Sequence, residues 1–206
     1  MAFIEVLKIK AFRNLWLSQL FSQVFLNVLF FSLIIRVYEV THSNAAVSIL
    51  VFLQTIPNIL VGAVAGVLVD RWGRKKVMFL SHFLRFFVVL GFLFSSESVG
   101  WVYILVLLIS VITQFFFPAE AGTIYQVVKE RKLLLTANSL FSVTFFASVI
   151  AGNVLAGPFL LIFGHVTTFI IVSLAFLMAS VFTSQLPKNE TKIITERLTL
   201  SNVFSE

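Results

Sequence analysis

Hydrophobic residues in this chain occur in long runs, and short polar segments separate the runs. A helix that crosses the hydrocarbon core of a membrane needs about 20 mostly apolar residues. The pattern predicts six such helices, at residues 14–38, 45–69, 77–96, 101–124, 138–162 and 166–185. Each run is expected to be helical because lipid offers the backbone no hydrogen-bond partner. We therefore predict an all-α membrane protein, with a six-helix unit over residues 1–186 and a polar tail over residues 187–206.

Composition agrees with this prediction and removes some chemistry from consideration. The chain is 59% hydrophobic and 12% charged, whereas soluble domains carry about 25% charged residues. It has no cysteine, which excludes disulfides, thiolate catalysis and cysteine metal sites. No cofactor is expected.

The basic residues divide unequally between the two sides of the predicted membrane. Short loops rich in lysine and arginine stay in the cytoplasm, so the richer side, which includes both termini, is predicted to be cytoplasmic, in a cell membrane. Arg36 alone falls on the other side, and Arg85 lies within the third segment. Because the basic groups are scattered over several loops, they do not form a nucleic-acid footprint. The richer side carries Lys8, Lys10, Arg13, Arg71, Arg74, Lys75, Lys76, Lys129, Arg131, Lys132, Lys188, Lys192 and Arg197.

The segment GVLVDRWGRKK joins the second and third predicted helices. Gly66 has no side chain, so a neighbouring helix could approach it closely. Gly73 permits a tight turn, and the carboxylate of Asp70 can pair with Arg71 or Arg74. Basic residues alone would fix the topology, so a carboxylate and two glycines at fixed spacing indicate a further role. The pattern comprises Gly66, Asp70, Arg71, Gly73, Arg74, Lys75 and Lys76.

This pattern resembles the signature loop of the major facilitator superfamily. The segments FRNLWLSQLFSQ (residues 12–23) and FFFPAEAGTIYQVVKERKLLLTANSL (residues 115–140) resemble the drug-efflux branch that includes macrolide and enterobactin exporters. The resemblance implies a half-transporter of two inverted three-helix repeats. It also implies small-molecule export by alternating access, with the loop latching the cytoplasmic gate. The expected partners are the lipid bilayer, a small-molecule substrate, protons in exchange, and either a C-terminal six-helix half or a second six-helix chain.

Polar residues recur at helical spacing inside three predicted helices. A spacing of four places amides on one helix face, and polar groups in a membrane face the bundle interior or a wet cavity. The resemblance implies that the first and fourth helices line the substrate path. The alternative is hydrogen bonding between helices, worth about 0.6 kcal/mol for each bond. The candidates are Gln19, Gln23, Asn27, Gln54, Asn58, Thr113 and Gln114.

Two charges fall deep inside predicted helices, away from their ends. Arg85 and Glu120 each lie roughly 13 Å from the cytoplasmic side, at a rise of about 1.5 Å per residue. Equal depth and opposite sign predict an ion pair between the third and fourth helices. The alternative is that Glu120 carries a coupling proton, since Pro118 frees backbone groups that could admit water. The first predicted helix contains no acidic residue.

Glycines repeat between the two halves of the chain. The pair Gly66 and Gly73 has the same spacing as Gly157 and Gly164, which is what an inverted repeat would produce. Gly152, Gly157 and Pro158 are expected to pack the fifth helix against a neighbour. They resemble only in part the glycine–proline motif of drug–proton antiporters.

The sequence also bears on three other classes of protein. A non-transporting assembly module derived from a truncated permease stays open, and a degenerate polar cavity would favour it. An intramembrane enzyme is not expected, because the histidines lie on different segments and no Gly-x-Ser-x-Gly elbow occurs. No segment resembles a channel selectivity filter.

Overall fold

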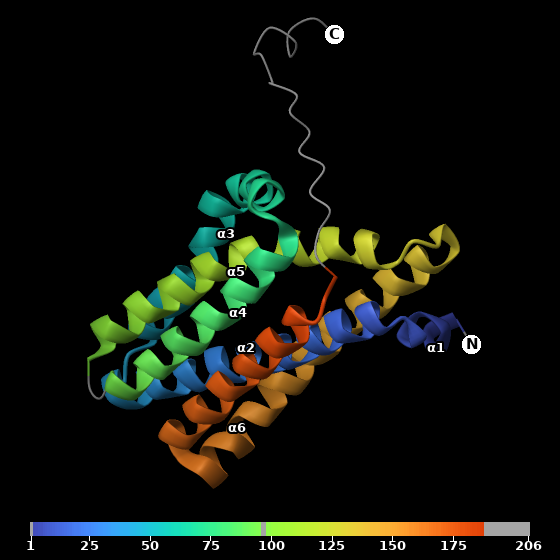
Figure 1. Cartoon of the computed structure of the whole chain (residues 1–206). Coiled ribbons are helices and arrows are strands. Elements are labelled where there is room, and N and C mark those ends of the chain that lie inside the picture. Colours follow the sequence, from blue (N-terminus) through green and yellow to red (C-terminus); the bar gives the residue numbers. More distant parts are fainter. Residues whose placement is uncertain (1, 96–97, 188–206) are drawn as a thin grey trace, which may run out of the picture.

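The computed structural model describes residues 2–95 and 98–187, and the regular structure in these ranges is helical (Figure 1). Nearly all of the predicted tail, with Lys188, Lys192 and Arg197, lies outside the described residues. The elements are α1 (Ala2–Lys8), α2 (Lys10–Thr41), α3 (Asn44–Trp72), α4 (Arg74–Gly91), the 3-10 turn η1 (Phe92–Phe94), α5 (Val99–Val127) and α6 (Arg131–Ser184).

Five of the described helices, α2 to α6, are long and apolar enough to cross a membrane. Their ends follow local sequence signals. Ser43 and Ser98 precede α3 and α5, and each side chain accepts a hydrogen bond, from the backbone N–H of Ala46 and Trp101 respectively. Such capping satisfies N–H groups that have no partner within the helix. Short helix α1 was not predicted.

Helix α6 contains a break in its middle. It has 54 residues, and a straight helix of that length would extend roughly 80 Å, far beyond a hydrocarbon core of about 30 Å. The backbone of Gly164 is non-helical, with φ 69° and ψ 176°. Figure 1 shows the chain turning back on itself at this point. The predicted boundary between residues 162 and 166 therefore lies where the helix breaks.

Two glycines turn the chain between neighbouring helical segments. Gly73 ends α3 with φ 87°, and Gly164 divides α6 with φ 69°. Backbone at positive φ strongly favours glycine. A side chain on Gly66 or Gly157, the partners at equal spacing, would meet nothing within 4 Å. The two glycine pairs thus have matching geometry. In each pair the first glycine lies in open surroundings and the second makes the turn.

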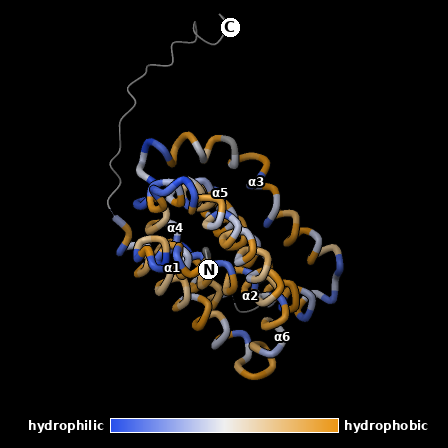
Figure 2. Tube along the Cα trace, turned by 90° about the vertical axis from the view of Figure 1, so that its right-hand side faces the viewer, coloured by the Kyte–Doolittle hydropathy of each residue, from blue (hydrophilic) through white to orange (hydrophobic). Residues whose placement is uncertain are grey.

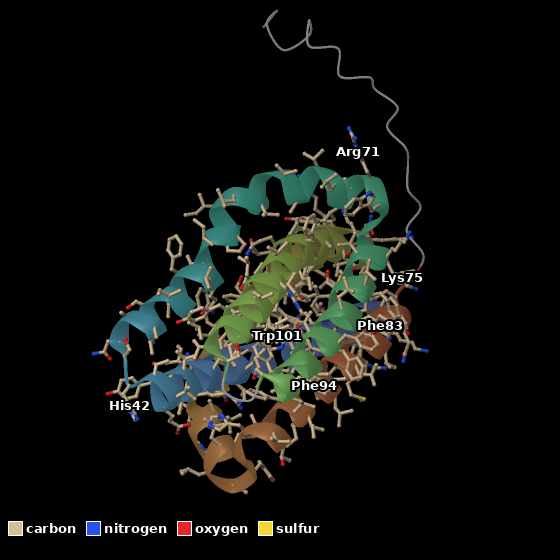
Figure 3. The ribbon with its side chains drawn as sticks, turned by 90° about the vertical axis from the view of Figure 1, so that its left-hand side faces the viewer. His42, Arg71, Lys75, Phe83, Phe94 and Trp101 are labelled. Atoms are coloured by element: carbon tan, nitrogen blue, oxygen red, sulfur yellow. The ribbon has the colours of Figure 1, made fainter. Side chains whose placement is uncertain are left out.

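The bundle has two distinct ends. At one end Asn14 donates to the side chain of Gln185 at 3.2 Å, and Lys75 donates to the carbonyl of Leu186. We call this the basic end, because it also carries Arg71, Arg74, Lys76, Lys129, Arg131 and Lys132. Figure 3 shows Arg71 and Lys75 far from His42, Phe94 and Trp101. All described loops predicted to share the cytoplasmic side lie at the basic end.

Much of the apolar surface faces outward. Only 11% of the most apolar stretch of α3 is buried, and Ile59 and Leu60 on that helix are 73% and 69% exposed. Hydrophobic positions extend along most of α3 and α6, whereas hydrophilic positions gather at turns (Figure 2). A protein in water rarely exposes large contiguous apolar surface, so this distribution is that of helices facing lipid or another apolar partner.

Candidate functional site

The predicted polar residues converge on one cavity between α2, α3 and α5. It has a volume of about 230 Å³. Spacing by four turns each set of amides toward a common side of its helix, and the helices face each other across the cavity. Of the seven candidates, the six that line it are Gln23, Asn27, Gln54, Asn58, Thr113 and Gln114.

Hydrogen bonds of these residues stay largely within their own helices. Asn27 Nδ2 donates to the carbonyl of Gln23 at 2.8 Å, and Thr113 Oγ1 donates to the carbonyl of Ile109 at 2.7 Å. Gln114 Nε2 reaches the carbonyl of Ser110 at 3.5 Å. These hydrogen bonds of the three residues do not bridge two helices, contrary to the alternative role.

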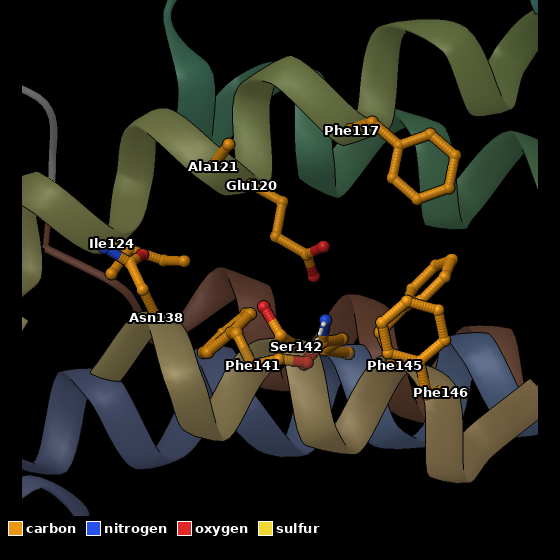
Figure 4. Close-up of a pocket in the computed structure, with 10 residues that line it drawn as sticks. Phe117, Glu120, Ala121, Ile124, Asn138, Phe141, Ser142, Phe145 and Phe146 are labelled. Atoms are coloured by element: carbon orange, nitrogen blue, oxygen red, sulfur yellow. Dashed lines mark hydrogen bonds between the residues drawn. The ribbon is translucent and has the colours of Figure 1, made fainter. Parts of the chain in front are cut away.

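Gln19 belongs to a second, larger cavity of about 550 Å³ between α2, α5 and α6. Its Nε2 donates to the carbonyl of Phe141 at 3.4 Å, so this residue does bridge two helices. Glu120 lines the same cavity, and Figure 4 shows its side chain reaching from α5 toward Ser142 on α6. Phe117 and Phe145 line both cavities, which are therefore adjacent.

The expected ion pair between Arg85 and Glu120 is not formed. Both side chains are buried, at 0% and 5% exposure, but the ion pairs of the described residues join other groups. The guanidinium of Arg85 lies over the rings of Phe116 and Phe176, 4.7 and 5.6 Å from their centroids. Equal depth in the membrane does not orient two side chains toward each other, and Arg85 faces an aromatic core instead.

A polar cluster that the sequence did not indicate joins α2, α4 and α6. Ser18 Oγ lies 3.0 Å from His82 Nε2 and 2.8 Å from Thr183 Oγ1. The three side chains are fully buried. The spacing of His82 and Arg85 places them on one face of α4. Ser18 and Ser22 repeat at a spacing of four within α2. This period is the one signal in the sequence from which a polar face at Ser18 could have been predicted.

The signature loop binds the ends of two other helices. Arg74 Nη2 lies 2.9 Å from Asp70 Oδ1, and Arg74 Nη1 donates to the carbonyl of Gly122 at 2.8 Å. Lys75 donates to the carbonyl of Leu186, just after α6. Positive charge near the C-terminal end of a helix also interacts favourably with the helix dipole. The loop thus holds α5 and α6 together at the basic end.

Four residues in or near the signature loop differ from this pattern or add to it. Close approach at Gly66 was expected and is wrong, because a Cβ there would meet nothing within 4 Å. Gly122 was missed: a Cβ there would lie 2.4 Å from Cζ of Arg74, so the small residue leaves room for the guanidinium. Arg71 and Lys76 are exposed at the surface.

Three residues were expected to pack the fifth predicted helix against a neighbour, and Gly152 packs against α2. A Cβ on Gly152 would lie 2.5 Å from the carbonyl oxygen of Val24 and 2.6 Å from Cβ of Asn27. Its lack of a side chain lets α6 touch the backbone of α2. The expectation is wrong for Gly157, around which there is open space. Pro158 lies inside α6 and is exposed.

At the end opposite the basic end, His165 Nε2 lies 2.9 Å from Glu39 Oε2. This contact holds the turn at Gly164 against the end of α2. In the described part of the chain, no three His, Asp or Glu side chains gather as metal ligands would.

Comparison with known proteins identifies the fold family. The sequence model described as the Major Facilitator Superfamily matches residues 15–201. The chain belongs to this superfamily. It is also 30% identical over 158 residues to the uncharacterized MFS-type transporter YfiS of Bacillus subtilis (strain 168). That match covers 76% of this chain and 37% of the relative, so the chain spans well under half the length of the relative. Membership and the apolar helices together make this a multi-pass membrane protein.

Proposed function

We propose that the chain is the N-terminal six-helix half of a secondary transporter that exports small molecules by alternating access. The observation that carries this proposal is the convergence of six polar side chains from three helices on one cavity. Polar groups buried within a membrane bundle usually mark a substrate path. A non-transporting module would not need such a cavity, so its presence favours transport over the alternative.

The proposed half contains six crossings, with α6 supplying two of them on either side of Gly164. The segments 131–163 and 165–184 are each long enough to cross a bilayer by themselves. Both termini and the basic end then face the cytoplasm, as the distribution of lysine and arginine favours. His165 and Glu39 would lie outside the cell.

The second half of the transporter is either a C-terminal six-helix unit or another six-helix chain. Alternating access requires one bundle to move against another around a central site. The coverage of only 37% of the relative is in keeping with a half-transporter. The exposed apolar side of α3 supplies surface for such a partner.

The two adjacent cavities form the proposed substrate path within this half. The signature loop fixes the cytoplasmic ends of α5 and α6, so it keeps the helices that line both cavities in register. Export of the drug-efflux type is supported by the segments at residues 12–23 and 115–140. Protons are the proposed exchange ion, and Glu120 is the acidic residue that the described helices place inside the bundle.

An efflux measurement tests this function on the product that the native gene makes. The intact mass of the protein from its native membrane is measured first: a value near 23.2 kDa means a separate partner, and about twice that value means a fused second half. Cells that express this product are then loaded with Nile red, which is neutral, or ethidium, which is cationic.

We expect faster release of at least one dye than from cells without the protein. Arg74→Ala should slow the release, because it removes the contacts to Asp70 and Gly122. Lys132→Ala, at an exposed position of the same end, is the matched control. Release equal to that of cells without the protein, for both dyes, would contradict the proposed function.

A further inference from the structure

The cavity around Glu120 contains two buried oxygens that accept hydrogen bonds and have no partner in the described structure. They are Glu120 Oε1 and Gln19 Oε1. The orientation of the Gln19 amide follows from its contact, since Nε2 must face the carbonyl of Phe141 to donate to it. A buried acceptor without a donor is costly. Both unpaired groups therefore favour a positively charged or hydrogen-donating ligand.

The remaining walls of the cavity are largely aromatic. Phe117, Phe141, Phe145 and Phe146 come from α5 and α6, and Figure 4 shows Glu120 reaching between the two helices that carry them. The faces of aromatic rings attract cations. At about 550 Å³, the cavity lies within the range of about 300–1,000 Å³ that holds small organic ligands.

The positive charge of Arg85 does not line this cavity. Its guanidinium packs on Phe116 and Phe176. Buried His82 lies with Arg85 and bonds to Ser18, and Arg74 pairs with Asp70. The carboxyl group of Glu120 is thus the ionisable group that a ligand in the cavity would meet first.

We propose that this cavity binds an organic monocation with a bulky apolar body, in which Glu120 takes the charge and the phenylalanine rings enclose the body. This inference rests on the proposed function and names the substrate class of the transporter. The cavity lining includes a single carboxylate, that of Glu120, so a second positive charge on the ligand would have no carboxylate opposite it.

The test compares two ions of nearly equal shape and opposite charge. Tetraphenylphosphonium and tetraphenylborate are each equilibrated by dialysis with the purified 206-residue chain in neutral detergent. Wild-type protein should bind the cation at least about tenfold more tightly than the anion, as a charge-assisted contact predicts. Glu120→Gln should remove this preference, and Glu130→Gln, an exposed carboxylate outside both cavities, should keep it.

Three results would overturn the inference: equal binding of both ions to wild-type protein, tighter binding of the anion, or a preference that persists in Glu120→Gln. The comparison of the two ions on wild-type protein needs no variant, so it remains valid if Glu120→Gln fails to fold. In that case Glu120→Asp replaces Glu120→Gln, and this variant should keep the preference for the cation with weaker binding. Failure of the inference is distinct from failure of the proposed function, because Arg74-dependent release of neutral Nile red would still support transport.

Discussion

Replacing Gly152 with alanine would put a methyl group into the contact between α6 and α2. The new Cβ would lie 2.5 Å from the carbonyl oxygen of Val24 and 2.6 Å from Cβ of Asn27. Carbon atoms in contact prefer about 3.5–4.0 Å, so the two helices must separate by close to 1 Å. The first of these contacts is backbone and cannot rotate away, which makes the change more damaging than a clash with a flexible side chain.

The expected free-energy change follows from two opposing terms. Overpacking of this kind costs about 1–3 kcal/mol, whereas alanine gains up to about 1 kcal/mol over glycine in helix propensity. Subtracting about 1 kcal/mol from that cost leaves a net loss for Gly152→Ala of about 0–2 kcal/mol, which lowers the melting temperature of a chain of this size by up to about 8 °C. Gly157→Ala is the matched control on the same helix, because a Cβ there meets nothing within 4 Å.

Thermal unfolding of the purified variants in detergent, followed by size-exclusion chromatography, measures both changes. Gly157→Ala should leave the melting temperature unchanged or raise it by up to about 4 °C. Equal destabilisation by the two alanines would refute the reasoning, since it would show that glycine is needed in α6 for a reason other than close packing.

Three further outcomes are expected. The chain has no native cysteine, so an introduced cysteine is the only one that a maleimide can label. His165→Cys should react with an impermeant maleimide added outside intact cells, and Lys132→Cys should react only after lysis. The reverse pattern would contradict the proposed topology. Gly122→Val should displace Arg74 from its carbonyl partner and slow dye release. The melting temperature should stay within about 2 °C of wild type, because the new side chain meets the far end of a flexible arginine, which can move aside. Unchanged release would contradict the role of this contact. Ser18→Ala leaves a buried imidazole without its partner. A loss of about 1–3 kcal/mol is expected, so the melting temperature should fall by about 2–12 °C. No fall would show that the cluster is not stabilising.

The polar residues of the first cavity could be predicted because spacing within one helix fixes direction. Gln54 and Asn58 repeat at a spacing of four, so both turn to one side wherever α3 is placed. Polar groups within a membrane favour a cavity or a neighbouring helix over lipid, and both residues line the first cavity. The turn at Gly73 could be predicted for a similar reason, since its cause lies in a few consecutive residues.

Contacts between distant parts of the chain could not be predicted in this way. Gly122 leaves room for Arg74 only because α5 passes the loop at this point, and nothing near either residue in the sequence records that approach. The bond between Ser18 and His82 depends in the same way on how α2 and α4 are rotated about their own axes.

Arg85 and Glu120 show why depth alone is an incomplete predictor of pairing in a membrane. Hydropathy and helical rise place both residues at the same level. Direction about the helix axis separates them: the guanidinium of Arg85 packs on Phe116 and Phe176, whereas Glu120 faces a cavity. A carboxylate already paired with arginine would have less charge to offer a ligand. The two side chains point in different directions about their helix axes, so the expected ion pair does not form. For the same reason, Glu120 stays available to a ligand.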